Sequence, residues 1–433
     1  MAGHRSKSRL KRPFGHSFVA ILLSLGCFFA AAETSPTGGC PATSALLSVE
    51  KMPGFHVICA SPGSGDTLHL CVFADGLRSE TCTHSLDVTK ETTVMDTINF
   101  LIKTLERTSL WPKSPVPGIF SGSGTRFPQE KTLKEIGLLE YRNVIVLVEG
   151  GVWHWPPVEI GFERPLKALV KGGPSIVLRT ISLIPRVFEV KSFIEDAEAV
   201  RILERAGPHI EKSVVRVMDK DIGRSVDDWR TSETFFLSST GDPILQGLDE
   251  RVQYLTRIPI DHAEHAQILK YGYRGRYTPH MDAFDPAFYQ KDADTLNLIG
   301  EGAYNRVLTV FMYLSDVEEG GETWFPKYAG RQDYDQESCS GGLVVKPERL
   351  KVIVFYNMYP NGQLDPHSVH GGCRVWNGTK WSANFWVWNV RRPYKTEEAS
   401  KNMAQEFSKW DPARDKSEES NLGSVTSPTK SEL

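Results

Sequence analysis

The sequence is poor in cysteine and has no large excess of charge. Its 433 residues include 7 cysteines, no Cys-x-x-Cys pair and a net charge of −3. The close thiolate pairs of structural zinc sites are therefore absent. The only cluster of basic residues lies within the first 12 positions. A nucleic-acid partner, held through clustered lysine and arginine side chains, is not expected.

Long uncharged runs are also rare, and the notable one spans residues 17–32. It follows a basic stretch and ends in Ala30-Ala31-Ala32, which predicts a secretory signal peptide over residues 1–32. The alternative is an uncleaved membrane anchor. A helix over this run would span about 24 Å, which is shorter than the ~30 Å hydrocarbon core. We therefore expect cleavage, and a membrane partner only if the segment is retained.

Cysteine placement and the last four residues indicate a compartment. Without Cys27, which lies in the signal peptide, an even number of cysteines remains in each half of the chain. This suits disulfides in an oxidising lumen. The ending Lys430-Ser431-Glu432-Leu433 resembles a relaxed Lys-Asp-Glu-Leu retrieval signal. Together these features predict the lumen of the endoplasmic reticulum.

A chain of this length predicts two domains. Residues 33–150 are expected to form a small α+β accessory domain. Its elements in order are strands at Leu68–Leu77 and Leu86–Val88, a helix from Val94 to Leu105 with Thr93 as N-cap, and strands at Ile119-Phe120 and Val144–Val148. The order resembles the ubiquitin-like β-grasp, although a generic α+β module fits too. Residues 151–184, rich in Gly, Pro and Trp, are expected to be a linker.

Residues 185–393 are expected to form the second domain. A strand near Val187 precedes a helix over Asp196–Ala206, and a second helix begins at Asp242 and Pro243. Its expected buried stripe is Ile244, Leu248, Val252 and Leu255. From Ala266 onward, short apolar runs separated by turns predict a double-stranded β-helix of the jelly-roll type with flanking helices, so the overall fold class is α+β.

Polar or weakly apolar segments interrupt or follow this domain. Residues 217–231 and 288–304 are long enough to be lids or binding loops, and plain insertions are an equally good interpretation. Residues 394–433 are charged and rich in serine, which predicts a disordered tail.

The chemistry is concentrated in three short segments. His280 and Asp282 lie two residues apart, so on a strand they share a face and can reach one ion. With His370 they make two histidines and one carboxylate, the set that non-haem Fe(II) oxygenases use with open positions for co-substrates. Lys380 could hold an anionic co-substrate beside such a metal. For a His-x-Asp pair alone, the polar face of a surface strand is the better interpretation.

The motifs around these residues are more specific evidence, because residues 185–393 resemble the catalytic domain of prolyl 4-hydroxylases. The matching runs are Tyr271-(x5)-Tyr277-(x2)-His280-x-Asp282, then Leu308 to Thr323, then Tyr356-Asn357-Met358, and His370-x-Gly372-Cys373-(x6)-Lys380-Trp381-Ser382-Ala383-Asn384. The sequence departs from the family pattern at Arg374 and at Leu350-Lys351-Val352, which could shift specificity.

The resemblance implies an Fe(II)- and 2-oxoglutarate-dependent dioxygenase with O2 as the second co-substrate and ascorbate as a helper. It implies His280, Asp282 and His370 as iron ligands, with His367 as the rival of His370. The remaining roles that it implies are Lys380 on the far carboxylate of 2-oxoglutarate, Tyr271, Thr309 and Trp386 around that pocket, and Arg230, Ser232, Glu264 and Tyr277 on the peptide substrate.

The implied substrate is peptidyl proline, in proline-rich or collagen-like polypeptides of the secretory pathway. Two alternatives stay open: a hydroxylase of lysine or a free amino acid, and a jelly-roll binding protein without catalysis. We also predict that His370 and Lys380 face inward across one hairpin, whose three-residue loop would hold Gly378 in the left-handed conformation. The same loop carries a glycosylation sequon at Asn377.

Overall fold

The computed structural model describes residues 41–107, 116–166, 175–335, 339–392 and residue 416. The expected signal peptide lies outside the described residues, and so does the expected disordered tail apart from residue 416. The described residues belong to one compact unit. Within the described ranges, no helix has the length and apolar character needed to cross a membrane.

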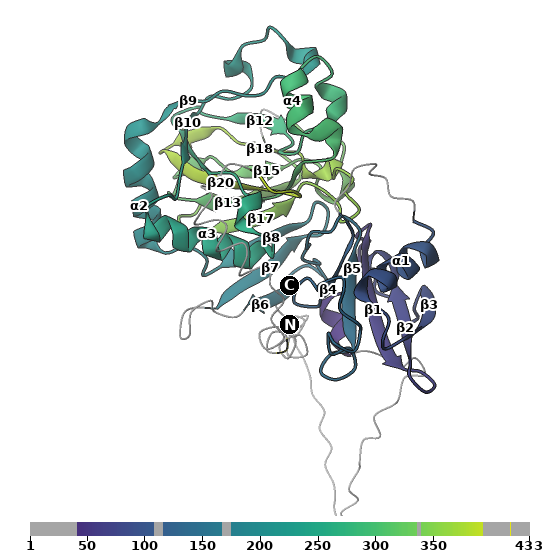
Figure 1. The fold of residues 1–433 in the computed structure, drawn as a ribbon. Helices are drawn as coiled ribbons and strands as arrows, with labels where there is room; N and C mark the ends of the chain where they lie inside the picture. Colours follow the sequence, from purple (N-terminus) through teal and green to yellow (C-terminus); the bar gives the residue numbers. More distant parts are fainter. Residues whose placement is uncertain (1–40, 108–115, 167–174, 336–338, 393–415, 417–433) are drawn as a thin grey trace, which may run out of the picture. The chain divides into compact units, whose positions relative to one another are not determined.

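The N-terminal module, residues 41–151, is a five-stranded antiparallel sheet with one helix (Figure 1). Its strands are β1 (Phe55–Pro62), β2 (Thr67–Phe73), β3 (His84–Thr89), β4 (Gly118–Ser121) and β5 (Val144–Val148), in the order β3-β2-β1-β5-β4. Helix α1 (Val94–Thr104) begins after Thr93, whose side chain accepts a hydrogen bond from the Asp96 amide, as the sequence predicts. The 3-10 helices are η1 (Pro41–Ala45) and η2 (Ala74–Gly76).

Strand β1 is an element that the sequence pattern did not reveal. It pairs antiparallel with both β2 and β5, so it separates two strands that run parallel to each other. Its first six residues are all buried, because Ile58 packs on the α1 side and Val57 on the catalytic side. A strand buried on both faces has no polar alternation to mark it. In addition, Leu77 lies beyond β2, which ends at Phe73.

Residues 151–184 are not a linker where the structure describes them. They contribute β6 (Glu163–Leu166) and β7 (Ile176–Ser182) to a nine-stranded sheet. Alternate residues of β7 are buried, which is the signature of a half-buried strand. The Gly, Pro and Trp content suggested irregular chain, but it is the packing of Trp153 and Trp155 in the main core that holds this segment.

The nine-stranded sheet has the order β6-β7-β8-β17-β13-β20-β11-β10-β9. Its other strands are β8 (Val187–Lys191), β9 (Glu211–Lys212), β10 (Glu233–Leu237), β11 (Ala266–Tyr271), β13 (Arg306–Tyr313), β17 (Val352–Tyr356) and β20 (Lys380–Trp388). Helices α2 (Asp196–Ala206) and α3 (Pro243–Thr256) pack on one face of it. The α3 stripe differs by one residue from the prediction, because Ile244 is 44% exposed and Leu245 is buried.

A four-stranded sheet, β12-β18-β15-β16, covers the other face. Its strands are β12 (Tyr277–His280), β15 (Thr323–Phe325), β16 (Leu343–Val345) and β18 (His370–Gly372). Phe311 and Phe355 of the large sheet pack with Phe325 and Val345 of the small one. Two antiparallel sheets joined by this core are consistent with a jelly roll. Strands β14 (Glu319–Gly320) and β19 (Val375–Asn377) pair separately.

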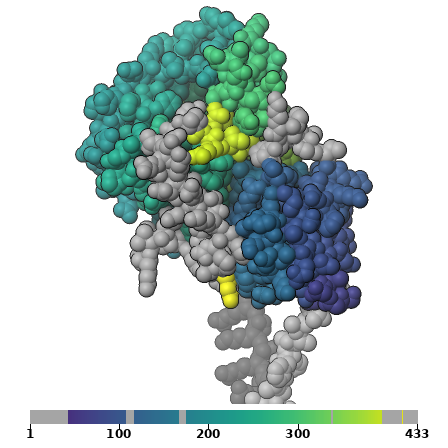
Figure 2. Space-filling model, in the orientation of Figure 1, coloured from purple at the N-terminus to yellow at the C-terminus, as the bar shows by residue number. Residues whose placement is uncertain are grey.

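Helix α4 and eight 3-10 helices fill the connections. They are η3 (Gly207–His209), η4 (Asp219–Asp221), η5 (Val226–Asp228), η6 (Ile260–His262), η7 (Pro286–Phe288), α4 (Ala293–Leu298), η8 (Gly300–Gly302), η9 (Tyr328–Gly330) and η10 (Pro366–Ser368). In the space-filling view the teal residues that follow α2 and the green residues around α4 meet on the face shown (Figure 2). The two long segments 217–231 and 288–304 are thus structured parts of the domain.

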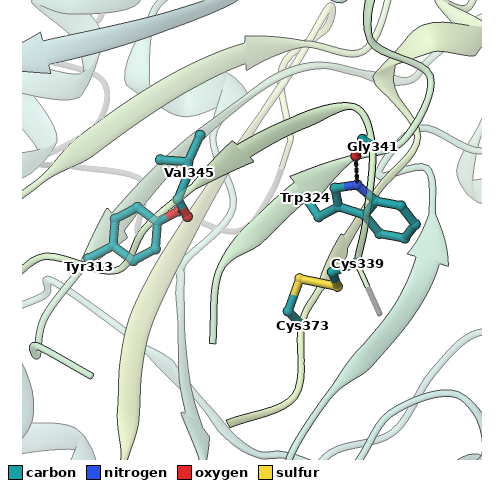
Figure 3. Close-up of a disulfide and its surroundings, with 6 residues drawn as sticks. All are labelled: Tyr313, Trp324, Cys339, Gly341, Val345 and Cys373. Atoms are coloured by element: carbon teal, nitrogen blue, oxygen red, sulfur yellow. Dashed lines mark hydrogen bonds between the residues drawn. A yellow bond between two sulfur atoms is a disulfide. The ribbon is translucent and has the colours of Figure 1, made fainter. Parts of the chain in front are cut away.

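A disulfide joins Cys339 to Cys373, the residue after β18 (Figure 3). Nearby, the indole of Trp324 donates a 2.5 Å hydrogen bond to the carbonyl of Gly341. Cys59 is disulfide-bonded as well, whereas Cys71 and Cys82 are free thiols. The disulfide expectation therefore holds for the C-terminal pair but not for every cysteine of the N-terminal module.

Candidate metal and co-substrate site

Strand pairing brings the candidate metal ligands together. His280 on β12 lies opposite His370 on β18 in the register of the small sheet, and Asp282 follows two residues after His280. One ligand atom from each of His280, Asp282 and His370 lies within 4.8 Å of the others. Because each residue is fixed by a paired strand or its end, the site is set by the sheet.

Both histidines present the same nitrogen to the centre of this group. Nδ1 of His280 lies 2.9 Å from the Thr278 carbonyl, and Nδ1 of His370 lies 2.9 Å from the Ser368 carbonyl. A carbonyl oxygen can only accept, so both Nδ1 atoms donate and the Nε2 atoms are left free to bind a metal. The two Nε2 atoms each lie 3.6 Å from a different oxygen of Asp282.

The pKa values of Asp282 and His370 are shifted in the directions that favour binding of a cation. Burial opposes ionisation of Asp282, but His370, His280 and Arg306 hold the pKa of its carboxyl well below the usual range. Burial lowers the pKa of His370 to about 4. A carboxylate and a neutral imidazole are the forms that ligate metal ions. Asp282 and His370 therefore fit a divalent metal without a prior change of protonation.

Thr309 supports the carboxylate from the large sheet. Its hydroxyl donates a 2.6 Å hydrogen bond to Oδ2 of Asp282, and its oxygen accepts a 3.2 Å hydrogen bond from Nδ2 of Asn357. The resemblance implied a place for Thr309 around the co-substrate. The structure places it directly beside a candidate metal ligand.

Lys380 is a buried cation without a carboxylate partner. It is 3% exposed, and among the described residues no carboxylate lies within ion-pair distance of it. Its Nζ lies 5.3–5.7 Å from the ring centroids of Tyr271, Phe311 and Tyr313, and Tyr271 is its register partner on β11. Burial lowers its pKa to about 7, although Glu322 opposes this effect. Such a group favours an anionic ligand.

The predicted hairpin between His370 and Lys380 is wrong. The two residues open strands of different sheets, β18 and β20, and the intervening β19 pairs with β14. Gly378 does adopt the left-handed conformation, with φ of +93°. Only the conformation of Gly378 was therefore predicted correctly, because Trp376 and Asn377 of the expected loop belong to β19. The two side chains converge because two sheets face each other, which local spacing cannot show.

A cavity of about 1000 Å³ opens beside the metal ligands. The lining includes His280 and Asp282, the predicted substrate residues Arg230, Glu264 and Tyr277, and also Trp386. Ser232 stands behind Arg230 and accepts a 2.8 Å hydrogen bond from its Nε. The Arg230 guanidinium lies 4.7 Å from the Tyr277 ring, which stacks on His280 at 3.6 Å.

The two long segments contribute to this cavity. Asp221 and Trp229 come from 217–231, and Phe288, Tyr289 and Leu298 come from 288–304. Two buried donors on the wall, Nη2 of Arg230 and Nε1 of Trp386, make no hydrogen bond with any residue that the structure describes. Buried donors without partners are costly, so these two positions suit acceptors of a bound chain.

Arg306 is a residue of this site that the sequence analysis missed. Its guanidinium pairs with Glu264 through contacts of 2.7 and 3.1 Å and lies 3.5 Å from the Trp386 ring centroid. Trp388 also donates to Glu264, at 2.7 Å. An arginine at the start of a strand that is otherwise apolar except for Thr309 was the available signal.

His367, the rival third ligand, lies apart from the cluster. It sits on η10, where its amide and its Nδ1 contact Oδ1 of Asp365 at 2.9 and 3.2 Å. It is not part of the group that could hold a metal. The structure therefore favours His370.

Comparisons with known proteins agree with this geometry. Residues 266–388 match the model of the 2OG-Fe(II) oxygenase superfamily. Probable prolyl 4-hydroxylase 10 of Arabidopsis thaliana is 39% identical over 216 residues, which are 48% of this chain and 70% of that protein. Prolyl 4-hydroxylase 1 of the same plant is 37% identical over 214 residues, again 48% and 70%.

Solved structures give weaker likenesses. The viral collagen prolyl hydroxylase of Paramecium Bursaria Chlorella virus-1 aligns with a TM-score of 0.34 and 20% identity, over 47% of this chain and 96% of that one. The identity and coverage of the plant proteins are decisive by themselves. The chain therefore belongs to the prolyl 4-hydroxylase family, within the Fe(II)- and 2-oxoglutarate-dependent oxygenases.

Proposed function

We propose that this chain hydroxylates proline at ring carbon 4 in peptides of the secretory pathway, with iron at His280, Asp282 and His370 and 2-oxoglutarate on Lys380. One observation carries the assignment of the site. Two histidines and an ionised carboxylate face one point, and the buried Lys380 on the neighbouring sheet has no carboxylate partner among the described residues. Membership of the family supplies the reaction class.

When bound, Fe(II) and 2-oxoglutarate would supply the oxidising chemistry, in which O2 is consumed, 2-oxoglutarate loses CO2 to become succinate, and proline gains one oxygen. The residues of this chain provide the geometry. Lys380 would hold the far carboxylate by a charge-assisted hydrogen bond. Tyr271, Phe311 and Tyr313 surround that lysine and exclude water from the pair. Thr309 keeps Asp282 oriented.

The cavity wall would position the peptide. Proline fixes its own φ, so a groove can present one ring edge to the site at little entropic cost. The unpartnered donors of Arg230 and Trp386 would bind peptide carbonyls. Ser232 holds the Arg230 side chain in place, and Glu264 holds Arg306 against Trp386. We include both proline-rich and collagen-like peptides in the substrate class.

The compartment, the reductant and the N-terminal fold belong to the same proposal. The signal-like segment 1–32 and the retrieval-like motif at residues 430–433 support a location in the endoplasmic reticulum lumen, and the family supports an ascorbate requirement.

For the N-terminal module we propose a β-grasp with β1 added between its central strands. The order of its other elements supports this, since β3-β2 and β5-β4 flank β1.

Mass spectrometry of peptides after incubation with enzyme, Fe(II), 2-oxoglutarate and ascorbate tests the function. Polyproline and collagen-like peptides should gain one oxygen atom per modified proline, with stoichiometric succinate, whereas free proline should react poorly. Modification of a lysine peptide instead would establish the alternative hydroxylase. A protein that binds neither Fe(II) nor 2-oxoglutarate would be a binding jelly roll.

A further inference from the structure

One of the contacts between the N-terminal module and the catalytic part is a short hairpin that leads to the third metal ligand. This metal-ligand hairpin, residues 356–365, joins β17 to η10. Its arms meet at Met358 and Leu364, and its tip is a turn in which the Gly362 amide donates to the Tyr359 carbonyl at 2.8 Å. Gly362 has φ of +90°, a conformation suited to glycine in such a turn.

Gly54 and Gly150 of the N-terminal module lie where its backbone forms hydrogen bonds with this tip. The Asn361 amide donates to the Pro53 carbonyl at 2.9 Å, and the Gly150 amide donates to the Pro360 carbonyl at 2.6 Å. A Cβ at Gly54 would lie 2.4 Å from the Asn361 nitrogen, and one at Gly150 would lie 2.7 Å from the Pro360 oxygen. The approach is so close that both positions exclude side chains.

The base of the hairpin is held by the segment that leaves the module. The Trp155 amide donates a 2.8 Å hydrogen bond to the Tyr356 hydroxyl, and the His154 ring stacks on Tyr356 at 4.8 Å. The buried Arg186 donates to the Met358 carbonyl and lies 3.1 Å from Nδ1 of His154. Tip and base are thus both fixed by residues outside the hairpin.

From this hairpin, two short paths reach the metal ligands. Asn357 donates to Thr309, which donates to Asp282. The Asp365 amide donates to the Asn357 carbonyl at 2.9 Å, and the Asp365 carbonyl accepts from the Ser368 hydroxyl at 2.7 Å. The Ser368 carbonyl in turn orients His370. A shift of the hairpin would therefore move a carboxylate ligand and a histidine ligand together.

We propose that the N-terminal module is a positioning element of the catalytic site. Its backbone contacts with the hairpin tip at Gly54 and Gly150 keep His370 and Asp282 in the geometry that iron requires. The inference rests on the proposed iron site. It assigns to the N-terminal module a part in catalysis that requires no contact with substrate. Catalysis depends on sub-ångström placement, so small displacements of ligands cost much activity.

The variant Gly54→Ala tests this in the full-length enzyme. Its Cβ would push the Asn361 backbone, and we expect the Fe(II) concentration for half-maximal activity to rise about 10- to 100-fold. The KM for the peptide should change far less, because neither path reaches Arg230 or Trp386, whose side-chain donors would bind the peptide. Gly65→Ala is the matched control, since Gly65 also has positive φ, +62°, in the same module, but a Cβ added there would meet no atom within 4 Å.

A merely structural role would lower the melting temperature of Gly54→Ala and leave the iron requirement of the folded fraction at the wild-type value. That result would overturn the proposal. A wild-type enzyme that binds no Fe(II) would instead overturn the iron site itself, so the two failures are distinguishable.

Amide hydrogen exchange of the wild-type protein provides a second test if Gly54→Ala does not fold. Coupling between two sites is reciprocal, so anaerobic Fe(II) should slow exchange at the Asn361 and Gly150 amides. The Thr67 amide, which bonds to Ser64 within the module, should be unaffected. Amide exchange rates at Asn361 and Gly150 that stay the same with saturating Fe(II) would contradict the proposal.

Discussion

The hydroxyl of Thr309 lies 2.6 Å from Oδ2 of Asp282 and donates to it. This contact joins the two sheets, since Thr309 belongs to β13 and Asp282 follows β12. A carboxylate that offers one oxygen to a metal has a second oxygen that needs a donor. Thr309 fills that need and fixes the rotation of the carboxylate.

Thr309→Val should therefore weaken Fe(II) binding without unfolding the sheet. Valine keeps the shape but loses the hydroxyl, and a hydrogen bond to a charged group is worth about 1.5–3 kcal/mol, or about 10- to 150-fold in the iron dissociation constant. Thr309→Ser, which retains the hydroxyl, is the control. An iron affinity for Thr309→Val equal to that of the wild type would remove this role.

His370→Ala should abolish turnover, whereas His367→Ala should remain active. Only His370 belongs to the candidate metal group, and His367 instead contacts Asp365. Iron content after purification and initial rates with a peptide substrate measure the difference. The reverse pattern, an active His370→Ala with an inactive His367→Ala, would move the third ligand to His367.

Lys380→Ala should raise the 2-oxoglutarate requirement by about 10- to 150-fold, the worth of a lost charge-assisted pair, while Fe(II) still binds. The matched control is Lys270→Ala, because Lys270 lies on the adjacent strand β11 but pairs with Glu233 at the surface. Titration of activity against 2-oxoglutarate decides the matter. An unchanged requirement would mean that Lys380 does not hold the co-substrate.

The pKa of about 7 for Lys380 predicts a pH-dependent affinity for 2-oxoglutarate. Only the protonated lysine can pair with a carboxylate, so the KM for 2-oxoglutarate should rise as the pH increases above about 7. In Lys380→Arg the guanidinium stays charged, and the rise should disappear. A wild-type KM that stays flat from pH 6 to about pH 9 would contradict the assignment.

The same buried lysine should make the ligand-free protein less stable at lower pH. Its folded pKa is below the ~10.4 of an unfolded lysine, so between these values the unfolded state binds more protons and the free energy of unfolding rises with pH. Lys380→Met removes that dependence and should raise the melting temperature at pH 7. Calorimetry of both proteins without 2-oxoglutarate compares them.

Reduction of the Cys339–Cys373 disulfide should weaken peptide binding more than iron binding. Lys327 and Tyr334 line the cavity and precede Cys339 in the chain. The disulfide links Cys339 to Cys373, the residue after β18. We expect Cys339→Ser to raise the peptide KM about 2- to 10-fold, the worth of an ordinary contact. Cys82→Ser, which removes a free thiol, is the control. A peptide KM equal to that of the wild type would separate this loop from substrate binding.

Some elements were fixed by local signals. Thr93 and Asp242 cap α1 and α3 as expected, because a capping side chain acts within its own helix turn. The residue types of the candidate metal group were also readable from the sequence. The strand argument for His280 and Asp282 does not hold, because β12 ends at His280 and Asp282 lies beyond it.

Other features depended on partners distant in the chain. Strand β1 and the segment 151–184 were misjudged because their burial comes from surfaces that the pattern of a short window does not contain. Lys380 faces the metal group through the packing of one sheet on another, and not through a hairpin turn. Arg306 entered the site by pairing with Glu264, 42 residues away. Spacing along the chain thus determined which chemical groups are present, and only the tertiary packing decided which of them meet, because burial and ion pairing join residues without regard to sequence distance.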